Sequence, residues 1–263
     1  MYAFNYERPA NLAAAQALLA AGGNALAGGQ TMIAAMKQRL QQPETVVDLG
    51  NISTLAGIRK EGNNLVIGAM TRHQDVADNA DVRQHIPALA ALADGIGDKQ
   101  IRTMGTLGGS VANNDPAACY PSAVLALGAT VHTDKRTIAA DDFFQGLYAT
   151  ALDAGELITA ISFPIPHKAA YAKFRQPASR FALVGVFVAQ TAAGARVAIT
   201  GAGNGVFRHA GLETALNGSF TPEAVTKVAI DASDLNADLH ASAAYRAHLI
   251  TVQTQRAVKQ ANG

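Results

Sequence analysis

The sequence lacks the residues that disulfide-linked and most metal-binding proteins require. It contains one cysteine, Cys119, in 263 residues. A single thiol cannot form an internal disulfide, and an iron–sulfur cluster needs about four cysteine ligands. The seven histidines are scattered without the spacing of a zinc site. We therefore expect no disulfide and no metal or cluster bound by this chain.

The sequence also has no large excess of charge of one sign and no long apolar run. The 21 basic and 20 acidic residues leave a formal net charge of +1, whereas nucleic acids and anionic membranes attract basic clusters. The longest apolar runs, residues 123–131 and 181–189, are far shorter than the roughly 20 residues that span a bilayer. The N-terminus has neither the basic start nor the apolar core of a signal peptide. These absences predict a cytoplasmic protein with no nucleic-acid partner and no membrane insertion.

Catalytic motifs built from side chains alone are absent too. The sequence has no G-x-S-x-G, no H-E-x-x-H and no close carboxylate pair. The mass of 27.2 kDa and the hydrophobic content of 49% are enough for two or three packed subdomains.

The most distinctive segment present is residues 102–116, with three glycines, five hydroxyl or amide side chains and one proline. This composition favours neither helix nor strand, and we expect a loop. Glycine permits close backbone approach to a ligand, so successive N–H groups can converge on a polyanion such as a phosphate. The alternative is an ordinary glycine-rich turn.

A second glycine pair lies upstream, in residues 24–32. The pattern predicts a short strand, a tight turn at Gly28 and Gly29, and a helix that begins near Met32. The first turn of such a helix presents unpaired N–H groups and a positive dipole end to an anion. Two loops are therefore candidates for binding two phosphates.

Periodicity and turn residues predict the other elements. Further strands are expected at residues 46–49, 55–59, 65–69, 130–133, 137–140, 157–163, 172–176, 181–190 and 196–200. Helices are expected at residues 12–19, 33–40, 71–77 (capped by Thr71), 86–96, 121–127, 209–216, 222–230 and 242–259. Phe143 and Phe144 are predicted to belong to the core. Proline punctuation at residues 164–166 marks the main domain boundary.

Two other features resemble parts of a dinucleotide-binding fold. Asp48 follows the first glycines by about 20 residues, and residues 201–205 form a glycine-rich turn after a strand. The G-x-G-x-x-G spacing is absent, and position 206 is Val206 where the third glycine would stand. We interpret Asp48 as a strand-end carboxylate and residues 201–205 as a structural turn.

The two glycine motifs together resemble those of a known family. They read Ala27-Gly28-Gly29-Gln30-Thr31 and Thr106-Leu107-Gly108-Gly109-Ser110. These are similar to the A-G-G-Q/H-S and T-I-G-G-S motifs of the flavin-binding medium subunits of molybdenum hydroxylases, the xanthine dehydrogenase and carbon monoxide dehydrogenase type. The flanks at residues 97–102 and 112–118 are also family-like, and Tyr171-Ala172-Lys173 matches the family's Y-x-K. The resemblance covers nearly the whole chain.

The resemblance implies an α+β fold, in which a two-subdomain FAD-binding fold of the PCMH type is followed by a small C-terminal domain of an antiparallel sheet plus helices. The domains would be residues 1–166, with subdomains of about 1–54 and 55–166, and residues 167–263. FAD would lie on this chain and carry its own redox chemistry, passing electrons from iron–sulfur clusters to an external acceptor. Molybdopterin and two-iron iron–sulfur clusters would lie on partners, a large molybdenum-cofactor subunit and a small iron–sulfur subunit, in a heterotrimer or a dimer of heterotrimers.

The resemblance also assigns cofactor contacts but no catalytic residue. Residues 25–32 would wrap the pyrophosphate, residues 106–110 would meet the pyrophosphate and ribityl chain from the other side, and Lys173 would lie near the isoalloxazine, with Ile96 and Ile158 as apolar contacts. The full expected set is Ala25, Leu26, Ala27, Gly28, Gly29, Gln30, Thr31, Met32, Ile96, Ile101, Thr106, Gly108, Gly109, Ser110, Asn114, Asp115, Cys119, Ile158 and Lys173.

One position departs from the family pattern. Many relatives have D-P-A-A-D where this chain has Asp115-Pro116-Ala117-Ala118-Cys119. Cysteine is a weak hydrogen-bond donor, so a contact made by the aspartate would be weakened here, or supplied by Asn114 or Asp115.

Two alternatives remain open from the sequence. One is a self-contained FAD oxidoreductase on a vanillyl-alcohol-oxidase-like fold, although the histidine often used there for covalent attachment has no counterpart near Gly28. The other is a flavin-free scaffold subunit, which would be expected to have degraded glycine motifs.

Overall fold

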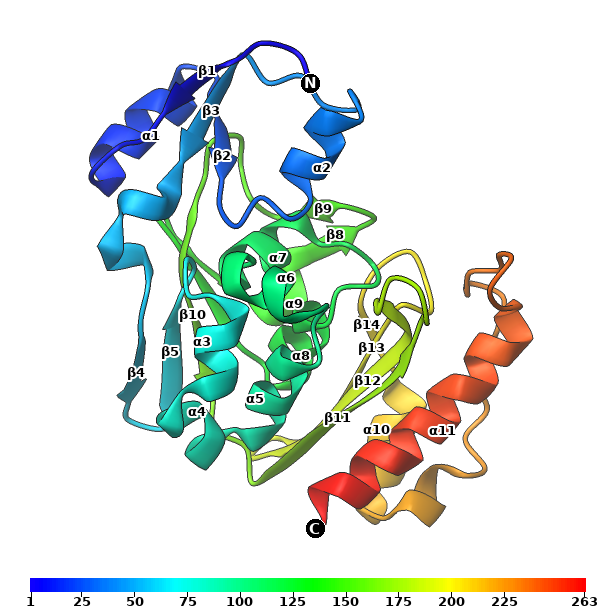
Figure 1. Cartoon of the computed structure of the whole chain (residues 1–263). Helices are drawn as coiled ribbons and strands as arrows, with labels where there is room; N and C mark the ends of the chain where they lie inside the picture. Colours follow the sequence, from blue (N-terminus) through cyan, green and yellow to red (C-terminus); the bar gives the residue numbers. More distant parts are fainter.

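Three larger sheets follow one another along the chain, helices cover them, and a fourth sheet is a two-stranded hairpin (Figure 1). The computed structural model describes all 263 residues. Its mixture of parallel and antiparallel sheets with helices agrees with the predicted α+β class. None of the helices has both the length and the apolar character needed to cross a bilayer.

The first sheet is parallel, in the order β1-β3-β2. Its elements are β1 (Asn5–Glu7), α1 (Leu12–Ala20), β2 (Asn24–Leu26), α2 (Met32–Lys37) and β3 (Thr45–Asp48). Asn11 caps α1 by accepting a hydrogen bond from the Ala14 N–H at 2.9 Å. The strand, turn and helix predicted around the first glycine pair are confirmed.

The predicted length of the second helix is wrong. The expected apolar position Leu40 is 74% exposed and lies outside α2. Arg39 adopts φ 62°, a left-handed conformation that ends the helical path before Pro43 is reached.

The second sheet is antiparallel and places a late strand at its centre, in the order β4-β5-β10-β6-β7. Its strands are β4 (Ile58–Glu61), β5 (Asn64–Gly68), β6 (Thr130–Thr133), β7 (Thr137–Ala139) and β10 (Ile158–Pro164). A separate hairpin joins β8 (Phe144–Gly146) to β9 (Ala149–Thr150). The predicted antiparallel arrangement of β6, β7 and β10 is confirmed.

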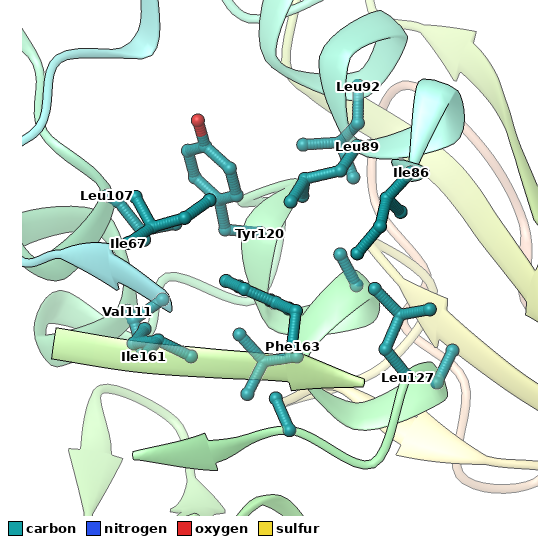
Figure 2. Packing of buried hydrophobic residues seen from close by; sticks show 14 of the residues in the cluster. Ile67, Ile86, Leu89, Leu92, Leu107, Val111, Tyr120, Leu127, Ile161 and Phe163 are labelled. Carbon is teal, nitrogen blue, oxygen red and sulfur yellow. The ribbon is translucent and has the colours of Figure 1, made fainter. Parts of the chain in front are cut away.

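A group of short helices packs against this sheet. They are α3 (His73–Asp78), α4 (Ala80–His85), α5 (Pro87–Asp94), α6 (Lys99–Met104), α7 (Leu107–Asn113), α8 (Tyr120–Ala126) and α9 (Ala140–Phe143). Figure 2 shows Ile67 and Ile161 of the sheet facing the same core as Leu89 of α5 and Tyr120 of α8. Burial of each such aliphatic side chain contributes roughly 1.5–3 kcal/mol.

Several sequence expectations in this region need correction. The helix predicted from residue 71 starts at His73, because the Thr71 hydroxyl is engaged with Gly57 and caps nothing. α4 was not predicted, and Ile86 precedes α5 as its N-cap. The expectation that Phe143 is a core residue is confirmed, since its side chain is fully buried.

The third sheet is antiparallel and is covered on both faces. Its strands are β11 (Lys168–Arg175), β12 (Ala182–Thr191), β13 (Gly194–Thr200) and β14 (Phe207–Arg208). On one face lie α10 (Ala210–Gly218) and α11 (Ala243–Ala261). The other face, with Phe187, Ala189 and Ala198, joins the core of the second sheet. The helix predicted at residues 222–230 is reduced to a 3-10 turn at Pro222–Val225.

A buried carboxylate ties the β6–β7 turn to the start of β10. Glu156 accepts hydrogen bonds from Arg136 Nε and Nη2, both at 3.0 Å, from Thr133 Oγ1 at 2.7 Å and from the Asp153 N–H at 2.8 Å. These donors favour the charged form, the Arg136 hydrogen bond most, and lower the pKa of Glu156 from 4.5 to about 2.

Glu156→Gln is expected to lower the free energy of unfolding by about 1.5–3 kcal/mol at neutral pH, because it removes hydrogen bonds to a charged group. Glu156 has a lower pKa in the folded state, so its stabilisation is complete above pH 4.5 and is lost as pH falls toward 2. Chemical denaturation of wild type and variant across this pH range measures the difference in their free energies of unfolding. Asp153→Asn is the control, since Asp153 is 65% exposed and its ion pair is worth under about 1 kcal/mol. A difference in free energy of unfolding between wild type and Glu156→Gln that stays constant down to pH 2 would contradict this role for Glu156.

Candidate cofactor site

A cavity of about 530 Å³ is lined by residues from all three parts of the chain. The turn between β2 and α2 forms one wall, the α6–α7 segment and the start of β10 form others, and Lys173 and residues 179–181 reach it from the third sheet. Its volume is within the roughly 300–1,000 Å³ of typical ligand sites.

The turn after β2 presents a row of free backbone donors. The five N–H groups from Gly28 to Met32 have no protein acceptor, and all five residues line the cavity. Gly29 has φ 70°, a conformation natural to glycine. The Gln30 side chain donates to the Gly28 carbonyl at 2.9 Å and stabilises the turn. Consecutive unpaired N–H groups at a helix start are suited to an anion.

The second glycine motif is helical, so the predicted loop is wrong. Thr106 is the N-cap of α7 and accepts from the Gly109 N–H at 3.2 Å. The N–H groups of Leu107 and Gly108 donate to the carbonyls of Thr71 and Ala69. The cap and these contacts outweigh the poor helix propensity of glycine. Because the N–H groups of residues 107–110 all have acceptors within the protein, they do not form a row of free donors like the one after β2.

The glycines of the second motif are explained by close packing. A Cβ at residue 108 would lie 2.5 Å from Ala69 Cβ, and one at residue 109 would lie 3.2 Å from Ala27 Cβ. Gly28 is tighter still, since a Cβ there would lie 2.2 Å from the Met104 carbonyl oxygen. The two motifs therefore contact one another, and small residues set how closely they approach.

The cavity brings together every expected site residue except one. Asn114 is fully buried outside it, and its side-chain amide donates to the carbonyls of Gly146 and Ala149 at 2.8 and 2.7 Å. It also ends α7 in a left-handed conformation with φ 43°. Asn114 therefore connects α7 to the β8–β9 hairpin.

The apolar and charged residues of the expected set are placed around the cavity. Ile96, Ile101 and Ile158 line it, as does the buried thiol of Cys119. Lys173 lines it and donates to the Gly95 carbonyl at 3.1 Å. Asp115 accepts from the Ala117 N–H at 2.8 Å and the Tyr148 hydroxyl at 3.2 Å. Asp115 lines the cavity together with Cys119, whereas Asn114 does not.

Sequence reasoning missed His73. Its side chain lines the cavity, and its Nδ1 is buried without a partner. Burial, and to a lesser extent the Arg102 charge, lower the pKa of His73 to about 4. The imidazole is thus neutral at pH 7. No local motif signals this role, since an isolated histidine in a helix is unremarkable.

Two further residues at the cavity were also missed. Arg180 donates to the Gly97 carbonyl at 3.3 Å, and Phe181 lines the cavity while 48% exposed. They follow Lys173 on the β11–β12 connection, so only the pairing of these strands brings them here.

The two dinucleotide-like features have structural roles. Asp48 accepts from the Tyr6 hydroxyl and the Gly50 N–H and pairs with Arg8, which confirms the strand-end interpretation. In residues 201–205, the Gly201 N–H donates to the Pro116 carbonyl, and its own carbonyl accepts from Arg246 at 2.8 Å. This segment is a turn that leads into β14.

Gly28→Ala is expected to destabilise the chain by about 1–3 kcal/mol, the usual cost of forcing atoms into a packed site, because its Cβ would collide with Met104. Gly218→Ala is the matched control, since residue 218 ends a helix with nothing within 4 Å of an added Cβ. Chemical denaturation of both variants measures the difference. Equal stability would show that the two motifs do not need this close approach.

Comparison with known proteins agrees with this architecture. Residues 2–166 match the family described as the FAD binding domain in molybdopterin dehydrogenase. The chain is 40% identical to the carbon monoxide dehydrogenase medium chain of Afipia carboxidovorans over 73% of this chain and 70% of that one. It is 34% identical to the nicotine 6-hydroxylase medium subunit of Paenarthrobacter nicotinovorans over 98% and 97% of the two chains. The solved structure of reconstituted CO dehydrogenase from Oligotropha carboxidovorans superposes with a TM-score of 0.92 at 34% identity, covering 99% of this chain and 98% of that one. The chain therefore belongs to the FAD-binding medium subunits of the molybdopterin dehydrogenases.

Proposed function

We propose that this chain is the electron-transfer subunit of a heteromeric molybdenum hydroxylase. Its partners would be a large molybdenum-cofactor subunit and a small iron–sulfur subunit, in a heterotrimer or a dimer of heterotrimers. When bound, FAD accepts electrons from the clusters of the small subunit and delivers them to an external acceptor. The proposal rests on the row of five unpaired N–H groups that line the cavity, in a chain whose family binds FAD.

The residues present fit a bound FAD. The unpaired N–H groups of Gly28–Met32 belong to half-buried and exposed residues that line the cavity. A pyrophosphate would supply several acceptors to them. We assign the Thr106 and Ser110 side chains to the same part of the cofactor. Ile96 and Ile158 line the cavity and would provide apolar contact for the flavin ring. The Lys173 ammonium would lie near the ring, where its positive charge would favour an anionic reduced flavin.

We also propose the domain division expected from the sequence. Residues 1–166 form the FAD-binding domain, with subdomains of about 1–54 and 55–166, and residues 167–263 form the C-terminal domain. The family match to residues 2–166 and the change of sheet after β10 support this division.

Exposed apolar side chains near the cavity support a partner interface. Met104 precedes the cavity-lining Gly105 and is 53% exposed, and the exposed Phe181 lines the cavity itself. Tyr148 is also exposed, while its hydroxyl bonds Asp115. Apolar surface of this kind is typical of contact sites between proteins.

Gly29→Asp is expected to bind FAD at least about tenfold more weakly than Gly29→Asn. Asn and Asp both tolerate a positive φ, and either would displace the flexible tip of Ile33. Only Asp adds a negative charge near the pyrophosphate, worth about 1–4 kcal/mol at 4 Å for effective dielectrics between water and a protein surface. Flavin absorbance after gel filtration and a fluorescence titration measure retention.

Lys173→Met should keep FAD in the same retention assay but change its reduction, which is followed by the loss of flavin absorbance during a reductive titration. Equal FAD retention by the Asp and Asn variants would place the pyrophosphate elsewhere.

Purification of the native complex should yield this chain with a molybdenum-containing and an iron–sulfur subunit. The isolated FAD-loaded chain should not oxidise an organic substrate at a useful rate, since it carries no substrate-oxidising centre in this proposal. Steady-state assays of the complex and the isolated chain with candidate aldehydes, purines, N-heterocycles and carbon monoxide make the comparison. Comparable turnover by the isolated chain would favour the self-contained oxidoreductase instead.

A further inference from the structure

A second cavity, of about 210 Å³, lies beside strand β11 and shares only Lys173 with the cofactor cavity. Its walls come from the end of α5, from β11 and from α11. β11 is an edge strand of its sheet, and Figure 1 shows α5 and α11 on either side of it. The cavity is therefore at the unpaired edge of the third sheet.

Positive charge dominates this second cavity. Lys173, Arg175 and Arg256 line it, and no carboxylate does. The guanidinium groups of Arg175 and Arg256 make no ion pair and donate no hydrogen bond to the protein, while Lys173 donates to the Gly95 carbonyl at 3.1 Å. The adjacent Asp94 is engaged with Arg102 at 3.4 Å. Like charges gathered at one cavity repel each other, and a bound anion relieves that repulsion.

A buried amide also lacks a partner at the same place. Gln253 of α11 is 1% exposed and lines the cavity, and its Nε2 has no hydrogen-bond acceptor. An unpaired buried donor costs about 1–3 kcal/mol. Gln253 and Arg256 are three residues apart in one helix, so their side chains lie on the same face. The amide side chain and the cations therefore line one cavity.

We propose that this cavity binds a small oxyanion of the phosphate class, either free or as the phosphate of a nucleotide. Arginine guanidinium groups recognise phosphate oxygens through charge-assisted and often bidentate hydrogen bonds. Gln253 adds a neutral donor to the remaining oxygen acceptors. The volume is below the roughly 300 Å³ of sites for drug-sized ligands, so the cavity fits a phosphate rather than a whole dinucleotide. The site is distinct from the unpaired N–H groups assigned to FAD.

Isothermal titration calorimetry of the FAD-loaded chain with inorganic phosphate, at constant ionic strength, tests this site. Saturable binding is expected, and Arg256→Gln should weaken it at least about tenfold, as for loss of a charged hydrogen bond. Lys259→Gln is the matched control, because it removes one positive charge from the same helix outside the cavity. Gln253→Met should also weaken binding while the three cations remain. Titration with AMP shows whether a nucleotide phosphate is preferred to the free ion.

The same titration on Gly29→Asp separates this site from the cofactor cavity. Binding that persists in this variant supports the second cavity, whether or not FAD is retained. Binding that is lost there places the phosphate in the cofactor cavity and overturns the proposal. Absence of saturable binding to the wild type, or equal weakening by Arg256→Gln and Lys259→Gln, also overturns it.

Discussion

The close approach of two backbone segments is the constraint on which the cofactor cavity depends. The turn after β2 rests against the end of α6, and only a residue without a side chain at position 28 allows that contact. The same turn leaves its amides unpaired toward the cavity. Those donors are open to solvent in the empty fold and are available to an anionic acceptor. One short segment thus contributes both to the packing and to the lining of the cavity.

Sequence reasoning predicted the first motif well because its features are local. A polar turn between an apolar strand and an apolar helix needs no distant contact to be recognised. The second motif was predicted as a loop because three glycines argue against helix, whereas Thr106 and the carbonyls of Ala69 and Thr71 stabilise α7. The family resemblance placed Asn114 in the expected set of cofactor contacts, and its side chain lies outside the cavity. Its partners are more than 30 residues away, in a hairpin that the sequence did not indicate.

The third sheet supports the cavity as well as forming a layer of its own. Eight consecutive residues of β12, from Ala182 to Ala189, are buried, because helices cover both faces of the sheet. This core continues from the second sheet without a break, so the boundary near Pro164 is not a free hinge. Lys173 therefore has a fixed place beside the cavity. The residues missed at the cavity, Arg180 and Phe181, depend on this same packing.

The position of β10 has a consequence for how the chain folds. It lies between β5 and β6 in the sheet but follows both of them in the sequence. These two strands therefore cannot complete their native pairing until β10 has been synthesised. Contacts between residues far apart in sequence slow folding, because the loop between them must close before they are formed. During synthesis, the edge of β5 and the edge of β6 that pair with β10 have no native partner until residue 164 has left the ribosome. Such edges invite wrong pairing with other chains, so we infer that early release of a truncated chain would favour aggregation.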